Sequence, residues 1–415
     1  MKSGKYSFGI GDRFAQQGEA QLKAFADAKL KGVNITPVWN KSNREHLTIK
    51  SDPSDTRKEA DNAVKNLKWD KPYFVDADHI NMSNVDKFMD SSDFFTIDVA
   101  DYIGKKASAG ELDDFISSNQ HFTGEFKIPG LDGSFTLTRE MIYLIGEKFL
   151  FAIKEASKIY KHIESKKGKG NFITEISMDE VNQSQSPLEL FFILSSIASE
   201  NIPVQTIAPK FSGRFNKGID YEGDLDIFEK EFEQDLLVID MAVKEFGLPE
   251  DLKLSVHSGS DKFSIYPIMG KLINKYDKGI HIKTAGTTWL EEMTGLALAG
   301  GEALNLAKSI YTRGLKRYDE LCEPYATVID IDKANLPAPN EISEWDGQRL
   351  ANALRHDPDH PEYNPDMRQL IHVAYKVAAE YGNNYINMLK EHKEIIAEQV
   401  TENIYKRHFS RIFNL

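Results

Sequence analysis

Short apolar runs recur along the chain and alternate with longer segments in which apolar residues return at helical spacing. The runs are rich in Val, Ile, Phe and Tyr and are too short for helices, so we interpret them as strands. Their nearly continuous apolar character is typical of parallel strands that are buried on both faces. The eight predicted strands are residues 6–10, 33–38, 73–77, 94–99, 172–176, 204–208, 254–256 and 280–282.

Helical patterns lie between these strands. In residues 224–246, for example, apolar residues such as Ile227, Phe228 and Phe232 recur at helical spacing. The other patterns cover residues 13–31, 55–67, 138–166, 187–200 and 262–275. A strand followed by a helix, repeated about eight times, predicts an α/β fold of the (β/α)8 TIM-like barrel type over residues 1–300.

Two regions depart from this alternation. Residues 101–138 are long, polar and glycine-containing, and they predict an insertion that forms either a lid over the barrel mouth or an excursion on the surface. Residues 301–415 are mostly helical in pattern and predict a C-terminal extension that packs on the barrel. Within it, the amphipathic tail 381–415 predicts a helix that serves packing or a homo-oligomer contact.

Composition narrows the class of protein. A net charge of -13 argues against a general binder of nucleic acid or of an anionic membrane, since both require a basic face. The longest apolar stretch, residues 141–153, contains Glu147 and Lys148 and is too short to span a bilayer. The single cysteine, Cys322, excludes an internal disulfide, and the start of the chain lacks a signal-peptide pattern. We therefore predict a cytoplasmic protein.

Three of the eight predicted strand ends carry a histidine: His79, His257 and His281. In a barrel of this type the carboxyl ends of the strands meet at the face that holds the active site. Imidazoles with nearby carboxylates suit a divalent cation such as Zn, Mn, Co, Ni or Fe. We predict these three histidines as metal ligands, with Glu175 as the substitute. Alternatively, one or more of them only hydrogen-bonds the substrate.

Two carboxylates are candidates for proton transfer. Asp78 precedes His79, and although neighbours on a strand face opposite sides, a strand that curls at its end lets both reach one site. We predict Asp78 as the general base and Glu175, across the mouth, as the partner acid. The alternative is that either carboxylate orients a metal-bound histidine.

Polar and basic residues near the predicted mouth suggest what binds there. Asn40 and Lys41 follow the second strand, Lys210 and Arg214 follow the sixth, and Ser258 follows His257. In an acidic protein such local cations indicate an anionic or polyhydroxylated small ligand, and we predict all five as substrate-binding residues. Ordinary surface charge is the alternative for each lysine. The Gly9-x-Gly11 pair lacks the third glycine of a dinucleotide fingerprint.

A second polar cluster lies late in the chain. His356 and His360 flank prolines, and Arg368 and His372 are four residues apart on a predicted helix and so share a face. This cluster predicts either an independent metal site or a loop that closes over the barrel mouth.

Several longer motifs resemble those of the tagaturonate–fructuronate epimerase family, which includes related enzymes that act on tagatose and fructose. They are residues 40–46 (NKSNREH), 75–79 (VDADH), 209–217 (PKFSGRFNK), 256–264 (VHSGSDKFS) and 368–372 (RQLIH). The resemblance implies a divalent-metal-dependent isomerase that epimerises ketohexuronates or the corresponding ketohexoses. It also implies that the acid–histidine pair Asp78 and His79 lies in the site, and that the partner is a small sugar or sugar acid.

The implied reaction constrains the chemistry. The two sugars differ at the carbon next but one to the ketone, so simple enolisation cannot invert it. Retro-aldol cleavage and re-addition would do so, with Asp78 or Glu175 taking the hydroxyl proton and a metal stabilising the enediolate. Two alternatives stay open: a metal-dependent sugar aldolase or isomerase on the same barrel, and a non-catalytic sugar-binding protein. The choice between a uronate and a neutral ketohexose depends on one cation, with Lys41, Lys210 and Arg214 as the positions concerned.

Overall fold

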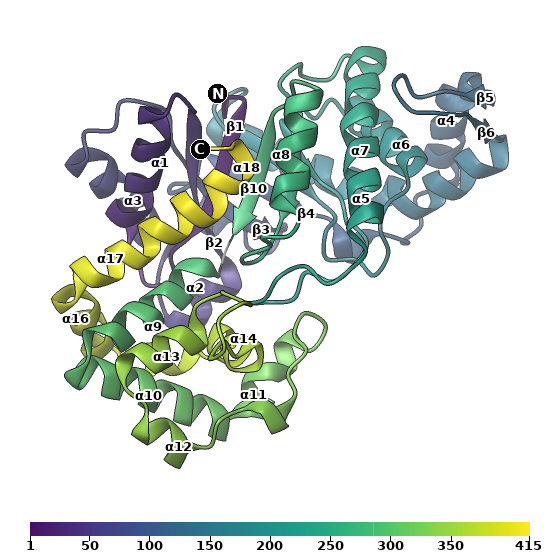
Figure 1. The fold of residues 1–415 in the computed structure, drawn as a ribbon. Coiled ribbons are helices and arrows are strands. Elements are labelled where there is room, and N and C mark those ends of the chain that lie inside the picture. The colour runs from purple at the N-terminus through teal and green to yellow at the C-terminus, as the bar shows by residue number, and fades with distance from the viewer. Residues whose placement is uncertain (285) are drawn as a thin grey trace.

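Eight parallel strands close into a barrel (Figure 1) in the computed structural model, which describes residues 1–284 and 286–415. Their order around the barrel is β1-β10-β9-β8-β7-β4-β3-β2. The strands are β1 (Tyr6–Gly11), β2 (Ile35–Ser42), β3 (Phe74–Ile80), β4 (Phe94–Asp98), β7 (Ile173–Ser177), β8 (Thr206–Ala208), β9 (Lys253–His257) and β10 (Ile280–Thr284). Each predicted strand is present, and the predicted (β/α)8 barrel is confirmed.

The interior of the barrel changes from apolar to polar along the strands. One buried cluster inside it consists of Val38, Phe74, Phe94 and Ile173. Two residues further along the same strands, and therefore on the same inner face, come Asn40, Asp76, Thr96 and Glu175. All four of these polar residues are buried. The polar layer lies toward the carboxyl ends of the strands, which makes that end the candidate site.

An outer layer of helices surrounds the strands. It includes α1 (Gly18–Leu30), α3 (Pro53–Asn66), α5 (Arg139–Lys167), α6 (Pro187–Ser199), α7 (Leu225–Phe246) and α8 (Tyr266–Lys275). Helix α6 begins where Ser186 and Glu189 form a reciprocal capping box, with Pro187 at the first position. In the part of the chain that the structure describes, no helix has both the length and the apolar character to cross a membrane.

Two of these helices begin later than the pattern predicts, because the residues before them are held in loops. Asp12 accepts hydrogen bonds from three main-chain N–H groups, those of Phe14, Gln16 and Gln17, so α1 begins only at Gly18. The ammonium of Lys262 donates to carbonyl oxygens of the loop after β8, and α8 begins at Tyr266. Both loops lie at the carboxyl end of the barrel.

The predicted insertion lies on the outside of the barrel. Residues 101–138 form α4 (Ala109–Asn119) and a two-stranded hairpin of β5 (Gly124–Phe126) and β6 (Phe135–Leu137). The ring of Phe115 lies 6.2 Å from that of Phe192 in α6, and Phe122 lies 6.0 Å from Phe246 in α7. Figure 1 shows α4 and the hairpin at the right-hand edge, away from the barrel mouth. The lid alternative was therefore wrong, and the surface excursion is the arrangement found.

The C-terminal helices gather on the carboxyl end of the barrel and then return along its side. The first group, in the lower part of Figure 1, comprises α9 (Thr287–Ala299), α10 (Gly301–Lys316), α11 (Tyr318–Cys322), α12 (Pro339–Glu344), α13 (Gly347–Leu354), α14 (Pro365–Val373), α15 (Tyr375–Glu380) and α16 (Asn383–Glu391). The predicted boundary at residue 300 falls between α9 and α10, which pack on each other, and it stays a prediction.

The tail completes the outer layer. Helix α17 (Lys393–Glu402), a π-helical turn (Asn403–Phe409) and α18 (Ser410–Phe413) run between α1 and α8 (Figure 1). Phe409 packs edge-on against Phe8 of β1 and Phe25 of α1, with ring centroids 5.0 Å apart in each case. The tail thus covers the part of the barrel that follows β10, and the predicted packing role is the one found.

Candidate active site

A buried lysine is surrounded by three carboxylates at the carboxyl end of the barrel. The Nζ atom of Lys283 lies 2.8 Å from Asp76 Oδ2, 3.0 Å from Asp78 Oδ1 and 2.9 Å from Glu175 Oε1. The hydroxyl of Thr96 also contacts it. Burial lowers the pKa of Lys283, but the three carboxylates outweigh burial and raise it well above its ordinary value. Lys283 is therefore protonated in the resting site, with three carboxylates around it.

Glu175 has one occupied and one free oxygen. Its Oε1 accepts a hydrogen bond from Thr96 and lies 2.8 Å from Nε2 of His257, whereas its buried Oε2 has no hydrogen-bond partner among residues 1–284 and 286–415. Burial raises the pKa of Glu175, but the positive charges of Lys283 and His257 hold it well below its usual range. Glu175 is thus an ionised carboxylate with one oxygen available to a ligand hydroxyl.

Asp78 and His79 reach the same site although they are neighbours on β3. His79 has a left-handed backbone conformation, with φ of 50°, and the register with β4 shifts between Ala77 and Ile80. A positive φ is unfavourable for a residue with a side chain, so this turn at the strand end costs conformational free energy. His79 Nε2 lies 3.8 Å from Asp78 Oδ1 and its Nδ1 lies 3.3 Å from Asp98 Oδ2. The curl expected at this strand end is present.

His79, His257 and Asp179 form a group whose ligand atoms all lie within 4.8 Å of one another. The two imidazole rings are 5.2 Å apart, and the buried Nδ1 of His257 lies 3.2 Å from Asp179 Oδ1. A second group of the same kind combines His79 with Asp98 and Glu180. Two nitrogens and a carboxylate oxygen suit the divalent cations predicted above, so these residues fit a metal.

The structure does not bring His281 to this group. Strand β10 continues to Thr284, two residues beyond the predicted end, so Lys283 reaches the mouth and His281 lies one layer deeper. His281 Nδ1 is 2.9 Å from the hydroxyl of Ser7, and its ring lies 5.2 Å from that of Phe94. Burial lowers the pKa of His281 to about 3, so the ring is neutral. Where three histidines were predicted, the structure groups two with Asp179.

The predicted substrate-binding residues divide into two sets. Asn40 lies on the inner face of β2, fully buried, and neither polar atom of its amide has a hydrogen-bond partner in the part of the chain that the structure describes. Ser258 is also buried, and its hydroxyl donates to the main-chain oxygen of Lys283 at 2.8 Å. Asn40 is therefore available to a ligand, whereas Ser258 supports the strand that carries Lys283.

The three predicted cations lie elsewhere. Lys41 points away from the barrel interior and donates to the main-chain oxygen of Arg13 at 2.5 Å. The Lys210 ammonium lies 5.9 Å from the ring of Phe215, and Arg214 is paired with Asp330 at the surface. Among the described residues, no ion pair or hydrogen bond joins these three cations to the carboxylates around Lys283.

Lys283 and Asp179 were not assigned a role by sequence. Lys283 follows the apolar run of residues 280–282, and a lysine at the end of a buried strand is a signal in itself, because a buried ammonium needs carboxylate partners. Asp179 belongs to the loop after β7, where its carboxylate accepts a hydrogen bond of 2.5 Å from Ser177. No periodicity distinguishes it from other loop aspartates.

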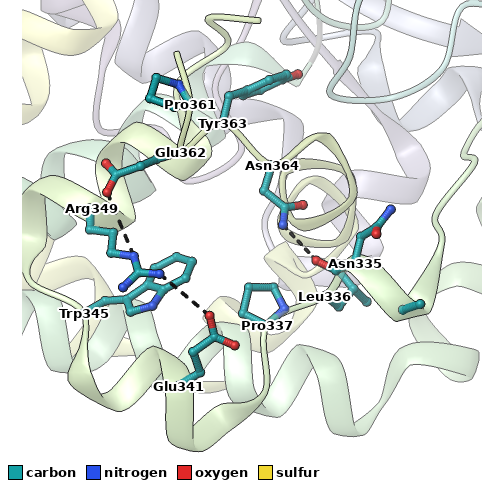
Figure 2. Close-up of a pocket in the computed structure, with 11 residues that line it drawn as sticks. Asn335, Leu336, Pro337, Glu341, Trp345, Arg349, Pro361, Glu362, Tyr363 and Asn364 are labelled. Atoms are coloured by element: carbon teal, nitrogen blue, oxygen red, sulfur yellow. Dashed lines mark hydrogen bonds and ion pairs between the residues drawn. The ribbon is translucent and has the colours of Figure 1, made fainter.

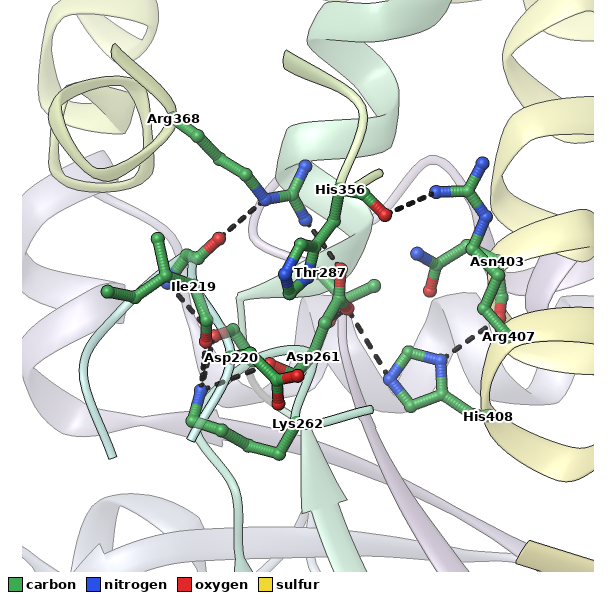
Figure 3. A network of polar contacts seen from close by, with 12 residues as sticks. Ile219, Asp220, Asp261, Lys262, Thr287, His356, Arg368, Asn403, Arg407 and His408 are labelled. Carbon is green, nitrogen blue, oxygen red and sulfur yellow. Dashed lines mark hydrogen bonds and ion pairs between the residues drawn. The ribbon is translucent and has the colours of Figure 1, made fainter. Parts of the chain in front are cut away.

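The late polar cluster is built around Asp261 (Figure 3). Its carboxylate lies 2.6 Å from Arg368 Nη2, 3.3 Å from His356 Nδ1 and 3.4 Å from His408 Nε2, and it accepts a hydrogen bond from Thr287. Burial raises the pKa of Asp261, but the guanidinium of Arg368 and the other donors hold it well below its usual range. This network ties the loop after β9 to the C-terminal helices.

That network does not support the predicted second metal site. The candidate metal groups found among residues 1–284 and 286–415 both contain His79. His360 is partly exposed and accepts a hydrogen bond from the main chain of Glu362. His372 is buried, and a Cβ atom on Gly286 would lie 1.8 Å from its Nε2, so these two residues pack in direct contact.

Replacing Asp261 by asparagine is expected to lower the free energy of unfolding by about 3 to 5 kcal/mol at pH 7, because Arg368 would keep a buried charge without its partner. Because folding lowers the pKa of Asp261, its contribution is present above about pH 4 and is lost as the pH falls through the lowered value. Urea unfolding curves at several pH values measure both effects. Asp277→Asn, at an exposed pair with Lys5, is the control and should unfold like the wild type. Equal curves for the two variants would contradict the expectation.

A separate cavity of about 340 Å³ opens among the C-terminal helices (Figure 2). At its edge the guanidinium of Arg349 lies over the ring of Trp345 and within 4.0 Å of the carboxylates of Glu341 and Glu362. The side-chain amide of Asn364 donates to the main-chain oxygen of Asn335. None of the lining residues belongs to the polar cluster in the barrel, so this cavity is not the candidate site.

Comparisons with known proteins agree with this architecture. The family described as tagaturonate epimerase, UxaE, matches residues 1–412. A tagaturonate/fructuronate epimerase from Thermotoga maritima is 27% identical over 420 residues, which cover 97% of this chain and 79% of the relative. Among solved structures, the glycerol complex of the fructuronate-tagaturonate epimerase UxaE from Cohnella laeviribosi has a TM-score of 0.81 at 22% identity, covering 99% of this chain and 82% of that one. The native form of the same protein has a TM-score of 0.79.

Proposed function

The chain belongs to the tagaturonate epimerase family, and on that premise we propose that it interconverts tagaturonate and fructuronate. The observation that carries the proposal is the family match over residues 1–412. The carboxylates and histidines at the carboxyl end of the barrel support it, because an epimerase of this kind needs groups that accept and return protons on two sides of a carbon.

We propose further that His79, His257 and Asp179 hold a divalent cation, one of Zn, Mn, Co, Ni or Fe. When bound, such a cation supplies Lewis-acid polarisation of the substrate ketone. His281 is not included, because its Nδ1 is hydrogen-bonded to Ser7 deeper in the barrel.

Asp78 is the proposed base. The neighbouring ammonium of Lys283 lowers the pKa of Asp78 against the effect of burial, so the carboxylate is ionised and ready to accept a proton. It would take the hydroxyl proton from the carbon that is epimerised. The bond from that carbon toward the ketone then breaks, its electron pair stays with the ketone fragment, and the other fragment becomes an aldehyde. Rotation of the aldehyde and re-addition to its other face invert the centre.

Lys283 links the two carboxylates and gives the proton a return path. Re-addition forms an alkoxide on the opposite face, where Glu175 presents its Oε2, which no described residue hydrogen-bonds. Glu175 is ionised, so it does not supply a proton from the resting state, as the predicted acid would have done. We propose that Glu175 passes a proton to the alkoxide as it receives one from Lys283, and that Lys283 regains one from protonated Asp78, because its Nζ lies within 3.0 Å of both carboxylates. The proton count is then unchanged over a cycle.

Asn40 is the proposed contact for the sugar hydroxyls. Both polar atoms of its amide are buried on the inner face of β2 and have no partner among the described residues, although buried polar groups are normally hydrogen-bonded. A bound polyhydroxylated substrate would satisfy one donor and one acceptor there. Water exclusion by the C-terminal helices would strengthen these contacts.

The test is product analysis after incubation of the metal-loaded enzyme with tagaturonate. We expect fructuronate at an equilibrium ratio that is the same from either direction. Accumulation of cleaved fragments would favour the aldolase alternative, and binding without turnover would favour the sugar-binding alternative. Parallel reactions with tagatose and fructose measure activity on neutral ketohexoses. Trapping of the aldehyde fragment tests the cleavage step, and bonds that stay intact throughout would overturn it.

A further inference from the structure

Lys217 is a half-buried lysine at the barrel mouth. It lies in the loop between β8 and α7, and its side chain extends over Gly259, two residues beyond His257. A Cβ atom on Gly259 would lie only 3.1 Å from Lys217 Nζ, and Gly259 has a φ of 68°. Within the described part of the chain, the Lys217 ammonium has neither an ion-pair partner nor a hydrogen bond. A cation at the mouth of the barrel is thus left without a counter-charge at close range.

Charged groups of both signs surround Lys217. Burial lowers its pKa, and the positive charges of Arg44 and Arg13 lower it further, while Glu180 and Asp179 act in the opposite direction. Arg13 is already paired with Glu45. Arg44 lies over the ring of Tyr325 at 5.1 Å and has no ion pair among residues 1–284 and 286–415. Lys217 is therefore within electrostatic range of Arg44 and of one carboxylate from each of the two metal groups.

The main chain on both sides of Lys217 is fixed. The N–H of Lys217 donates to Val328 at 2.7 Å, and the N–H of Gly218 donates to the hydroxyl of Ser260 at 2.9 Å. Arg368 and Lys262 donate to the main-chain oxygens of Gly218 and Asn216. A cation held in this way is pre-organised, so little ordering entropy is lost when an anion binds to it.

We propose that Lys217, with Arg44 beside it, binds the carboxylate of the hexuronate and so makes the site select uronates over neutral ketohexoses. The inference rests on the proposed epimerase function and names the substrate class of that site. A hexuronate carries its carboxylate at the end of the chain remote from the ketone, and Lys217 lies within electrostatic range of Asp179 without being part of the metal group. These residues replace Lys41, Lys210 and Arg214 as the cations that decide between the two substrates.

The ammonium of Lys217 explains how the site would select uronates over neutral ketohexoses. A carboxylate forms a charge-assisted hydrogen bond with an ammonium, which is stronger than the bond a neutral hydroxyl makes. A ketohexose would place a hydroxymethyl group at the same position and leave the cation without its counter-charge. Sites built to bind one polar group discriminate strongly against an analogue that lacks it.

Binding of galactonate and galactitol tests this inference. The two compounds share their hydroxyl groups and differ in a terminal carboxylate against a hydroxymethyl group. Calorimetric titration of the metal-loaded protein is expected to show about 30-fold tighter binding of galactonate. Lys217→Met should reduce that preference to within about 3-fold, and Lys217→Arg should keep most of it. Lys230→Met, at an exposed lysine of α7, is the matched control and should behave as the wild type.

Three results would overturn the inference: no preference for galactonate in the wild type, a preference unchanged in Lys217→Met, or equal weakening of both compounds. Lys217→Gln is the second neutral variant, with circular dichroism as the check that each variant is folded. Turnover of tagaturonate by the wild type is measured on the same preparation. If the wild type turns over tagaturonate but shows no preference for the carboxylate, only the inference about Lys217 is refuted. If it prefers galactonate but does not turn over tagaturonate, only the epimerase proposal is refuted.

Discussion

Replacing Asp78 by asparagine is expected to lower the turnover number for tagaturonate by about 100-fold to 10,000-fold, the range that a positioned general base contributes. Asparagine has nearly the same shape but cannot accept the hydroxyl proton, so the step before bond cleavage loses its base. The Michaelis constant should change far less, because Asp78 acts on a proton and not on binding. Rates of fructuronate formation at saturating substrate measure the effect.

Asp113→Asn is the matched control, since Asp113 is exposed in α4 on the outer side of the barrel. It should leave turnover at the wild-type value. An Asp78→Asn enzyme that retains more than about a third of wild-type turnover would exclude Asp78 as the base, given the contribution expected of one. The role would then pass to Glu175, whose Oε2 has no hydrogen-bond partner among the described residues.

Removal of the metal is expected to lower activity by more than about 1,000-fold, because polarisation of a carbonyl by a cation is worth several kcal/mol in the transition state. Dialysis against a chelator, followed by return of Zn, Mn, Co, Ni or Fe one at a time, measures the dependence. The same loss is expected for His257→Ala, which removes one of the three grouped ligands, together with loss of bound metal by elemental analysis.

His281→Ala separates the structural assignment from the sequence prediction. His281 is hydrogen-bonded to Ser7 and packs against Phe94. Its replacement by alanine should therefore leave a cavity that lowers the free energy of unfolding, but the protein should keep its metal. Loss of metal from His281→Ala, or full activity after chelation, would contradict the grouping of His79, His257 and Asp179.

The barrel was predictable because its strands are buried on both faces and interrupt the helical pattern as apolar runs. The positions at which the strands end were less predictable. A run of apolar residues stops at the first polar residue, yet β2 continues through Asn40 and Lys41, and β10 continues through Lys283. These polar residues stay in the strands because their main chain is paired with the neighbouring strands, and Lys283 is also stabilised by its three carboxylate partners. The position of His281, one layer below the mouth, follows from that extension.

Site residues on strands were foreseen better than those on loops. Asp78, His79, Glu175 and His257 could be placed because the carboxyl ends of parallel strands share one face. Asp179 and Lys217 lie in loops, which have no regular periodicity from which the direction of a side chain could be predicted. Only the folded chain brings them to the mouth. Similarly, the polar and glycine-containing sequence of the insertion did not indicate where it would lie. Its contacts with α6 and α7 are made by Phe115 and Phe122.

The position of the tail between α1 and α8 bears on the order in which the protein folds during synthesis. The gap in the outer layer beside β1 and β10 is covered by residues 393–413, which are translated after all eight strands. A nascent chain that has emerged only as far as α16 therefore exposes Phe8 and Phe25, the side chains that Phe409 later covers. Exposed apolar surface of this kind is what chaperones bind. The barrel thus depends on its last helices for protection of its first strand, and folding on the ribosome cannot be finished domain by domain from the N-terminus.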